Sequence, residues 1–173
     1  MKLSDDDFTL FGLPQRFAIE RAALDERWRA LQAEVHPDRH ATQGTAAQRV
    51  AAQWSMRINE AHRRLRDPLA RAAALCELRG ARVDAERNTA MPAAFLQQQL
   101  AWREALEDAA DVQAVRTIED DVAAQERLML GDLERLLDSD EREPAAAAAQ
   151  VRALMFVARF REDIERRVDT LEQ

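Results

Sequence analysis

Residues 20–38 read ERAALDERWRALQAEVHPD, and this stretch decides the fold of the N-terminal half. Its large apolar residues lie four, three and four positions apart: Leu24, Trp28, Leu31 and Val35. This spacing places them on one face of an amphipathic helix. The helix must end before Pro37, because proline lacks an amide donor and keeps its predecessor out of helical geometry. The stretch therefore predicts a helix over about residues 20–35, followed at once by His-Pro-Asp.

A second long helix is predicted after this tripeptide. A loop over about residues 39–45 contains Gly44 and small polar residues. The next helix, about residues 45–66, has an expected buried stripe of Val50, Trp54, Ile58, Ala61 and Leu65. Two helices joined by such a loop make a stiff hairpin with the tripeptide at its tip. Residues 8–14, FTLFGLP, predict a short helical turn before it, capped by one of three aspartates at 5–7.

The remaining residues predict further helices over about residues 69–78, 92–109, 112–137 and 145–171. Pro and Gly separate them, and the last three have short connections, which favours an antiparallel three-helix bundle. Residues 80–90 are polar without clear periodicity. We therefore expect an all-α protein with an N-terminal helical-hairpin domain over 1–79, a linker or entry segment over 80–90, and a C-terminal bundle over 91–173.

The composition excludes several classes of function. The net charge is −7, with 13 Lys and Arg against 11 Asp and Glu in residues 1–79, but 12 against 21 in residues 80–173. This acidic C-terminal half argues against nucleic-acid binding. No apolar run approaches the ~20 residues that a bilayer requires, so no membrane association is expected. The single cysteine, Cys76, excludes an internal disulfide, and the acidic N-terminus does not resemble a signal peptide. We expect a cytoplasmic protein.

The His36-Pro37-Asp38 tripeptide has the chemistry of a docking tip. Pro37 restricts the backbone before docking, the Asp38 carboxylate can accept two hydrogen bonds from a partner arginine, and His36 can hold the loop. Alone, the tripeptide also fits an accidental polar turn. His36 and His40 are four apart, but the intervening proline spoils the helix that would align them on a metal. His62 is expected to be a helix-surface histidine, and no metal site is expected.

A second candidate surface follows from periodicity in the C-terminal half. At about 100° per residue, Phe95, Trp102 and Leu106 share one direction and predict the core face of their helix. Two leucines of this helix lie off its core face, beside charged residues. On the last helix Val157, Ile164 and Val168 predict the core stripe, and two other apolar residues lie off it. These off-stripe residues are Leu96, Leu100, Met155 and Phe156. They predict a partner surface, with packing against the N-terminal half or a wider core as the alternative.

The hairpin and its tripeptide resemble a J domain, and the chain from Phe8 onward resembles the HscB family. The resemblance rests on FTLFGLP at 8–14, HPD at 36–38, INEA at 58–61, LRDPLARA at 65–72, and AFL at 94–96 with Leu100, Arg103 and Glu104. A Gly/Phe-rich segment and a Cys-x-x-Cys repeat, which mark general-purpose J proteins, are missing from the sequence.

This resemblance implies a co-chaperone of iron–sulfur cluster assembly. It would bind an IscU-type scaffold through its C-terminal helices and stimulate the ATPase of HscA, a DnaK-type chaperone, without being an enzyme or holding a cofactor. The implied chaperone-binding residues are Arg29, His36, Pro37, Asp38 and Arg39. The implied client-binding residues are Leu96, Leu100, Arg103, Glu104 and Phe156. The alternative is a J-domain protein that recruits a different client to a DnaK-type chaperone.

The sequence departs from the family after the tripeptide and on the preceding helix. Arg39-His40 stands where the family usually has Lys-Phe, which keeps the charge but loses an apolar contact. Three arginines of the preceding helix are offset by neighbouring carboxylates. Electrostatic attraction to the chaperone is therefore expected to be weaker, or to come from the next helix through Arg57, Arg63, Arg64 and Arg66. An enzyme would require converging titratable groups, whereas the acidic residues are predicted on helix surfaces.

Overall fold

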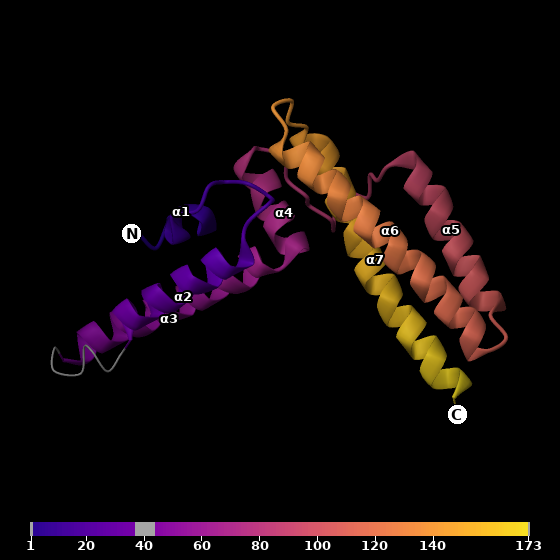
Figure 1. Ribbon diagram of the computed structural model, residues 1–173, viewed down its shortest axis with the longest axis horizontal. Coiled ribbons are helices and arrows are strands. Elements are labelled where there is room, and N and C mark those ends of the chain that lie inside the picture. The colour runs from indigo at the N-terminus through magenta and orange to yellow at the C-terminus, as the bar shows by residue number, and fades with distance from the viewer. Residues whose placement is uncertain (1, 37–43, 173) are drawn as a thin grey trace. The chain divides into compact units, whose positions relative to one another are not determined.

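The computed structural model describes residues 2–36 and 44–172, and every regular element in these ranges is an α-helix. The helices are α1 (Asp7–Phe11), α2 (Arg21–Val35), α3 (Thr45–Arg66), α4 (Pro68–Leu78), α5 (Ala93–Asp108), α6 (Val112–Asp138) and α7 (Pro144–Leu171), as Figure 1 shows. The all-α prediction is confirmed. The bounds expected for the six longer helices differ from these by one residue at most.

The chain divides into two compact units, 1–71 and 72–173, and the division falls within α4. The N-terminal unit contains α1, α2, α3 and the first residues of α4. The C-terminal unit contains the rest of α4 and the three long helices that follow. The domain bounds expected from the sequence, 1–79, 80–90 and 91–173, stay a prediction.

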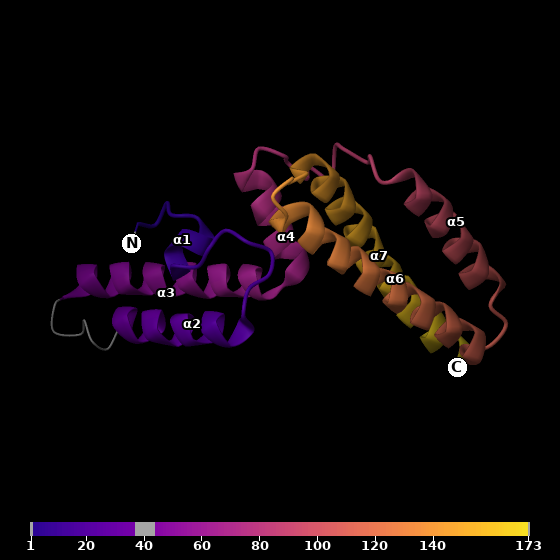
Figure 2. The ribbon, with the colours of Figure 1, turned by 45° about the horizontal axis from the view of Figure 1, so that its top comes forward.

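The N-terminal unit is built on a hairpin in which α2 and α3 lie side by side (Figures 1 and 2). The buried side chains of α3 are those of Ala51, Ile58, Ala61 and Leu65. Trp54, which was predicted in the buried stripe, is only half-buried, and with it these residues fall at alternating spacings of three and four. The prediction for Val50 was wrong, because its side chain is 53% exposed while that of Ala51 is 4% exposed. Both residues lie within a helical turn of Trp54, and only Ala51 continues the alternating spacing into the seam.

The short helix α1 is held at both ends by local hydrogen bonds. The Asp6 carboxylate accepts hydrogen bonds from the backbone amides of Phe8 and Thr9, both at 3.0 Å. At the other end Gly12 has φ 64, a left-handed conformation that glycine adopts without a steric penalty. Phe8 and Phe11, which the capped turn presents, are both buried in the core of the unit.

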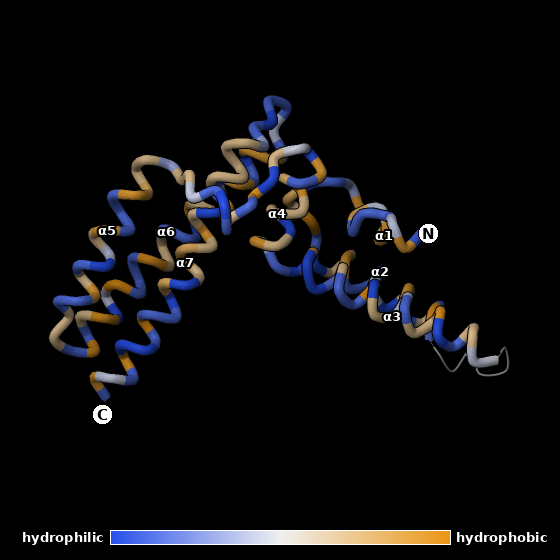
Figure 3. Tube along the Cα trace, turned by 180° about the vertical axis from the view of Figure 1, so that it is seen from behind, coloured by the Kyte–Doolittle hydropathy of each residue, from blue (hydrophilic) through white to orange (hydrophobic). Residues whose placement is uncertain are grey.

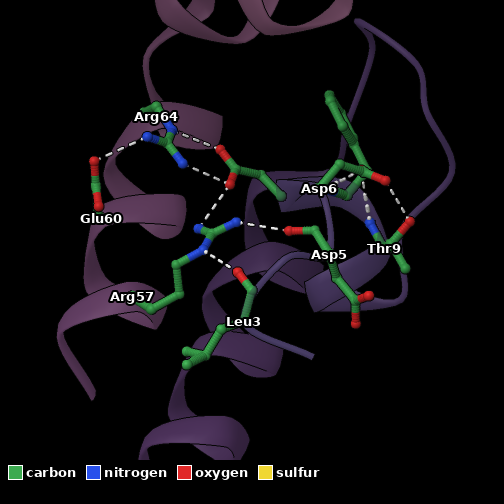
Figure 4. A network of polar contacts seen from close by, with 9 residues as sticks. Leu3, Asp5, Asp6, Thr9, Arg57, Glu60 and Arg64 are labelled. Carbon is green, nitrogen blue, oxygen red and sulfur yellow. Dashed lines mark hydrogen bonds and ion pairs between the residues drawn. The ribbon is translucent and has the colours of Figure 1, made fainter. Parts of the chain in front are cut away.

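A buried carboxylate connects α1 to α3. Asp7 is 6% exposed and accepts two hydrogen bonds from Arg64, at 2.7 and 2.8 Å, while Arg57 forms an ion pair with it at 2.8 Å. Figure 4 shows both arginines reaching from α3 toward the N-terminal segment, where Arg57 also donates to the carbonyl of Asp5 at 2.8 Å. Burial raises the pKa of the Asp7 carboxyl, but the two arginines outweigh this and hold it below its ordinary value.

Replacing Asp7 with asparagine is expected to lower the free energy of unfolding by about 2 kcal/mol at neutral pH, because two arginines then lose a covered carboxylate. Glu60→Gln is the matched control, since Glu60 pairs with the same Arg64 at 2.9 Å but is exposed. An exposed pair is worth about 0.5 kcal/mol or less. Urea denaturation of the three proteins measures the difference, and equal costs for the two substitutions would contradict this description.

The same network predicts a dependence of stability on acid. The folded-state pKa of Asp7 lies below its unfolded value, near 3.8. Its contribution is therefore complete above that pH and disappears as the pH falls through the folded-state pKa. Denaturation at stepped pH values should show a stability difference between wild type and Asp7→Asn that is constant near neutrality and shrinks below about pH 4. A difference that stays constant down to pH 2 would contradict the assignment.

The C-terminal unit is a three-helix bundle in which α6 and α7 pair along their length and α5 packs against both. Apolar and polar positions alternate within each of these helices, as the colouring in Figure 3 shows. The expected core face of α5 is confirmed, because Phe95, Trp102 and Leu106 are all buried. Trp102 also donates from Nε1 to the carboxylate of Asp121 on α6 at 2.7 Å, which fixes the orientation of the indole ring.

Arginine side chains attach backbone ends to this bundle. Arg152 on α7 is 5% exposed and donates to the carbonyl of Ala90 at 2.6 Å and to that of Val83 at 3.0 Å. Arg79 and Arg167 donate in the same way to carbonyls at the ends of α6 and α5, where helices leave acceptors unpaired. The polar segment over 81–90 is thus fastened to α7 by two hydrogen bonds, a feature that its composition did not reveal.

Candidate partner-binding surfaces

The tripeptide begins where α2 ends. Val35 is the last residue of the helix, and His36 follows it as an exposed C-cap with φ −58 and ψ 127. Pro37, Asp38 and Arg39 lie outside the described residues, as does His40. Arg29, the remaining residue implied for chaperone binding, is exposed on α2, and its Nε donates to the carbonyl of Asp25 at 3.2 Å. The helix end therefore lies where the sequence predicted it.

A network of side-chain hydrogen bonds joins α2 to α3 below this tip. Asn59 accepts from Trp28 Nε1 at 2.9 Å and from Gln32 Nε2 at 2.7 Å. Gln32 in turn accepts from the Ser55 hydroxyl at 2.9 Å. Sequence reasoning quoted Asn59 as part of the INEA motif without a role, and the structure provides one: it fixes the register of the two helices that carry the tip.

His62 lies between helices, so the prediction of a helix-surface histidine was wrong. Its side chain is 13% exposed, its ring stacks on Trp28 with centroids 4.9 Å apart, and its Nε2 donates to the Asp25 carboxylate at 2.7 Å. This hydrogen bond lowers the pKa of the Asp25 carboxyl, with help from the charges of Arg66 and Arg21. Helical periodicity could not predict that His62 is covered, because it does not show that the large side chain of Trp28 on α2 reaches across to stack on the His62 ring.

The basic residues of α3 are not equally available for electrostatic steering. Arg57 and Arg64 are both engaged by the buried Asp7, so they hold α1 in place. Arg63 and Arg66 are exposed. The sequence predicted four arginines on this helix as a source of attraction, and the structure reduces the outward-facing set to these two.

The residues implied for client binding gather on α5 and α7. Leu96 is 45% exposed and Leu100 is 57% exposed, which agrees with their expected position off the core face of α5. Arg103 and Glu104 are exposed and follow Leu100 by three and four residues, so they lie about one turn further along the same side of the helix. The Arg103 guanidinium lies 5.3 Å from the centroid of the Phe156 ring, which brings the two helices together at this surface.

Phe156 is half-buried and belongs to an aromatic cluster. Its ring meets Phe95 edge-on at 5.7 Å and stacks on Phe160 at 5.9 Å, and Phe160 stacks on Trp102 at 6.0 Å. Phe156 therefore packs in part, as the alternative of a wider core expects, and the rest of its side chain stays open. Its contact with a client stays a prediction.

The described residues offer little for bond-breaking chemistry. Cys76 is free and buried, and burial raises the pKa of its thiol to about 11, so it stays protonated at neutral pH. In residues 2–36 and 44–172 no group of three or more His, Cys, Asp or Glu side chains is placed to hold a metal ion. None of the helices in these ranges is both long and apolar enough to span a bilayer. What the surfaces present is exposed apolar area beside arginines, which is typical of protein contacts.

Comparison with known proteins shows relatives that match nearly the whole chain. Residues 91–165 match the family model described as the HSCB C-terminal oligomerisation domain. A protein of Burkholderia multivorans named co-chaperone protein HscB homolog is 47% identical over 99% of both chains, and one of Bordetella petrii with the same name is 49% identical over 93% of this chain and 95% of its own. The structure of chaperone HscB from Vibrio cholerae has a TM-score of 0.78 at 36% identity, covering 96% of this chain and 99% of its own.

The human co-chaperone HscB shares the fold, with a TM-score of 0.85 at 23% identity over 95% of this chain and 83% of its own. A helical hairpin followed by a three-helix bundle, matched over full length by such relatives, defines a J-domain co-chaperone. The chain belongs to the HscB family, and the resemblance stated from its sequence motifs is confirmed.

Proposed function

We propose that this co-chaperone binds an IscU-type scaffold with its C-terminal unit and stimulates the ATPase of an HscA/DnaK-type chaperone with its N-terminal unit, in the cytoplasm and without catalytic activity of its own. The observation that carries the proposal is the full-length relationship: relatives named as HscB co-chaperones match 99% of the chain, so both units are matched together. A protein that needed only one of these activities would not require both units.

The geometry supports a division of labour between the units. The hairpin is stiffened by its polar network and presents His36 at the end of α2, as a docking finger requires. On the other unit Leu96 and Leu100 present apolar area beside Arg103 and Glu104, the composition of a protein interface rather than of a catalytic pocket. We propose that Asp38 accepts hydrogen bonds from a chaperone arginine and that the two leucines contact the scaffold.

Titration calorimetry with the purified scaffold tests the client half of this proposal. A saturable interaction with a dissociation constant in the micromolar range is expected, because a few half-exposed apolar side chains must also offset the cost of association. Lack of detectable binding, with stimulation of the chaperone retained, would favour the alternative of a J-domain protein that recruits a different client. Affinity purification with the full chain as bait would then identify that client.

A further inference from the structure

A pocket of about 390 Å³ lies in the C-terminal unit between residues 85–91, α5 and α7. Four arginines line it, Arg103 from α5 and Arg152, Arg159 and Arg166 from α7, against two carboxylates, Glu162 and Asp163. This excess of positive charge stands out in a chain whose net charge is −7. A concave site with such lining attracts a negatively charged group.

The arginines of the pocket differ in what already occupies them. Arg152 is buried and uses two of its nitrogens on backbone carbonyls, so its charge is fixed at the back of the site. Arg166 is paired with Asp163. In the described part of the chain, Arg103 and Arg159 have no carboxylate partner: Arg103 lies over the Phe156 ring, and Arg159 donates only to the carbonyl of Met155 in its own helix.

The pocket adjoins the face of α5 that carries Leu96 and Leu100, because Arg103 lines the pocket and also lies on that face. Arg103 follows Leu100 by three residues and Leu96 by seven, so the three side chains share one face of α5. Phe156 also lines the pocket, and the Arg103 guanidinium lies over its ring. A protein segment lying across the leucines would therefore reach the arginines without leaving the surface.

We infer that this pocket receives an acidic side chain of the docked scaffold, held by Arg103 and Arg159 in front of the buried charge of Arg152. The inference rests on the proposed function and adds the chemistry of recognition to it. The leucines supply apolar contact, and the arginines select a partner that carries a carboxylate at the matching place. A carboxylate there forms charge-assisted hydrogen bonds, which are stronger than neutral ones and directional.

Arg159 offers the test, because it is exposed and its replacement leaves the packed core intact. Scaffold affinity is measured by calorimetry at low and high salt for wild type, Arg159→Gln, Arg159→Glu and the control Arg127→Glu. Arg127 is an exposed arginine of α6 that does not line the pocket, so its variant reproduces the change in net charge. Melting temperatures verify that each variant is folded.

The inference predicts that Arg159→Glu weakens scaffold binding about tenfold at low salt, that Arg159→Gln has a smaller effect, and that Arg127→Glu changes affinity less than twofold. A single Asp or Glu of the scaffold, replaced by lysine, should restore the affinity of Arg159→Glu. Equal affinities for Arg159→Glu and Arg127→Glu would overturn the inference while leaving the proposed function standing. Failure of the wild type to bind the scaffold would overturn both.

Inorganic phosphate serves as a second probe. If phosphate raises the melting temperature of wild type but not of Arg159→Glu, and scaffold affinity is insensitive to Arg159, the pocket is a small-anion site and the inference is wrong. If phosphate instead competes with the scaffold for wild type alone, the pocket recognises an anionic group of the scaffold, as inferred.

Discussion

Replacing Asp38 with alanine is expected to abolish the stimulation of the chaperone ATPase. The proposed role of its carboxylate is to accept hydrogen bonds from an arginine of the chaperone, and removal of one partner from a docked, hydrogen-bonded charge pair costs about 2–5 kcal/mol. This corresponds to at least about thirtyfold in the concentration needed for half-maximal stimulation. Steady-state ATP hydrolysis with increasing co-chaperone measures it.

Glu34→Ala is the matched control for this experiment. Glu34 is an exposed carboxylate in the last turn of α2, close in sequence to the tripeptide and without an assigned role in docking. Its removal should leave stimulation within about twofold of wild type. Full stimulation by Asp38→Ala, or an equal loss in both variants, would contradict the role given to the tripeptide. Scaffold affinity should be unchanged in both, because the proposed scaffold contacts lie on the C-terminal unit.

Replacing Leu96 and Leu100 together with alanine is expected to weaken scaffold binding about thirtyfold. About half of each side chain is already covered in the free protein. Docking therefore adds about 1 kcal/mol for each leucine, about 2 kcal/mol together. Surface positions of this kind tolerate alanine with little change in stability, so the variant should fold normally.

Leu128→Ala provides the comparison for the leucine pair. Leu128 is 67% exposed on α6 and lies outside the residues implied for client binding. The Leu128→Ala variant should bind scaffold with the affinity of wild type. If the double variant also binds scaffold with the affinity of wild type, the two leucines of α5 do not belong to the interface. Stimulation of the chaperone in the absence of scaffold should be the same for all three proteins, because that activity is assigned to the other unit.

The fold was predictable because proline and glycine residues in the sequence mark where its helices begin and end. α2 ends at Val35, just before the His-Pro-Asp sequence, Gly80 has φ 78 just after α4, and Pro144 opens α7 in its first turn. Exact burial was harder, since helical periodicity permits either Val50 or Ala51 in the seam and only the packed structure selects between them. Periodicity did identify Leu96 and Leu100 on α5 as exposed, because their angle from the core face of the helix is too large for ambiguity.

The polar contacts between different helices were not predictable, because each of them joins residues far apart in sequence. Asp7 meets Arg64, and Arg152 meets the carbonyl of Val83, only once the helices have packed. For the same reason Arg57 and Arg64 were interpreted as steering charges when they in fact hold α1. The sequence offered one signal for the Asp7 contact: Asp7 is the only charged residue of the short helix α1.

The central claim is that one chain couples a scaffold on its C-terminal unit to a chaperone stimulated by its N-terminal unit. The most direct test is the steady-state ATPase rate of the chaperone, measured at a scaffold concentration too low to act alone. Three proteins are compared: wild type, the double variant with Leu96→Ala and Leu100→Ala, and Asp38→Ala. Wild type should give more stimulation with scaffold than without it, because binding raises the local scaffold concentration. The leucine variant should keep only the scaffold-independent part, and Asp38→Ala should show neither part. Identical rates for wild type and the leucine variant in the presence of scaffold would contradict the coupling.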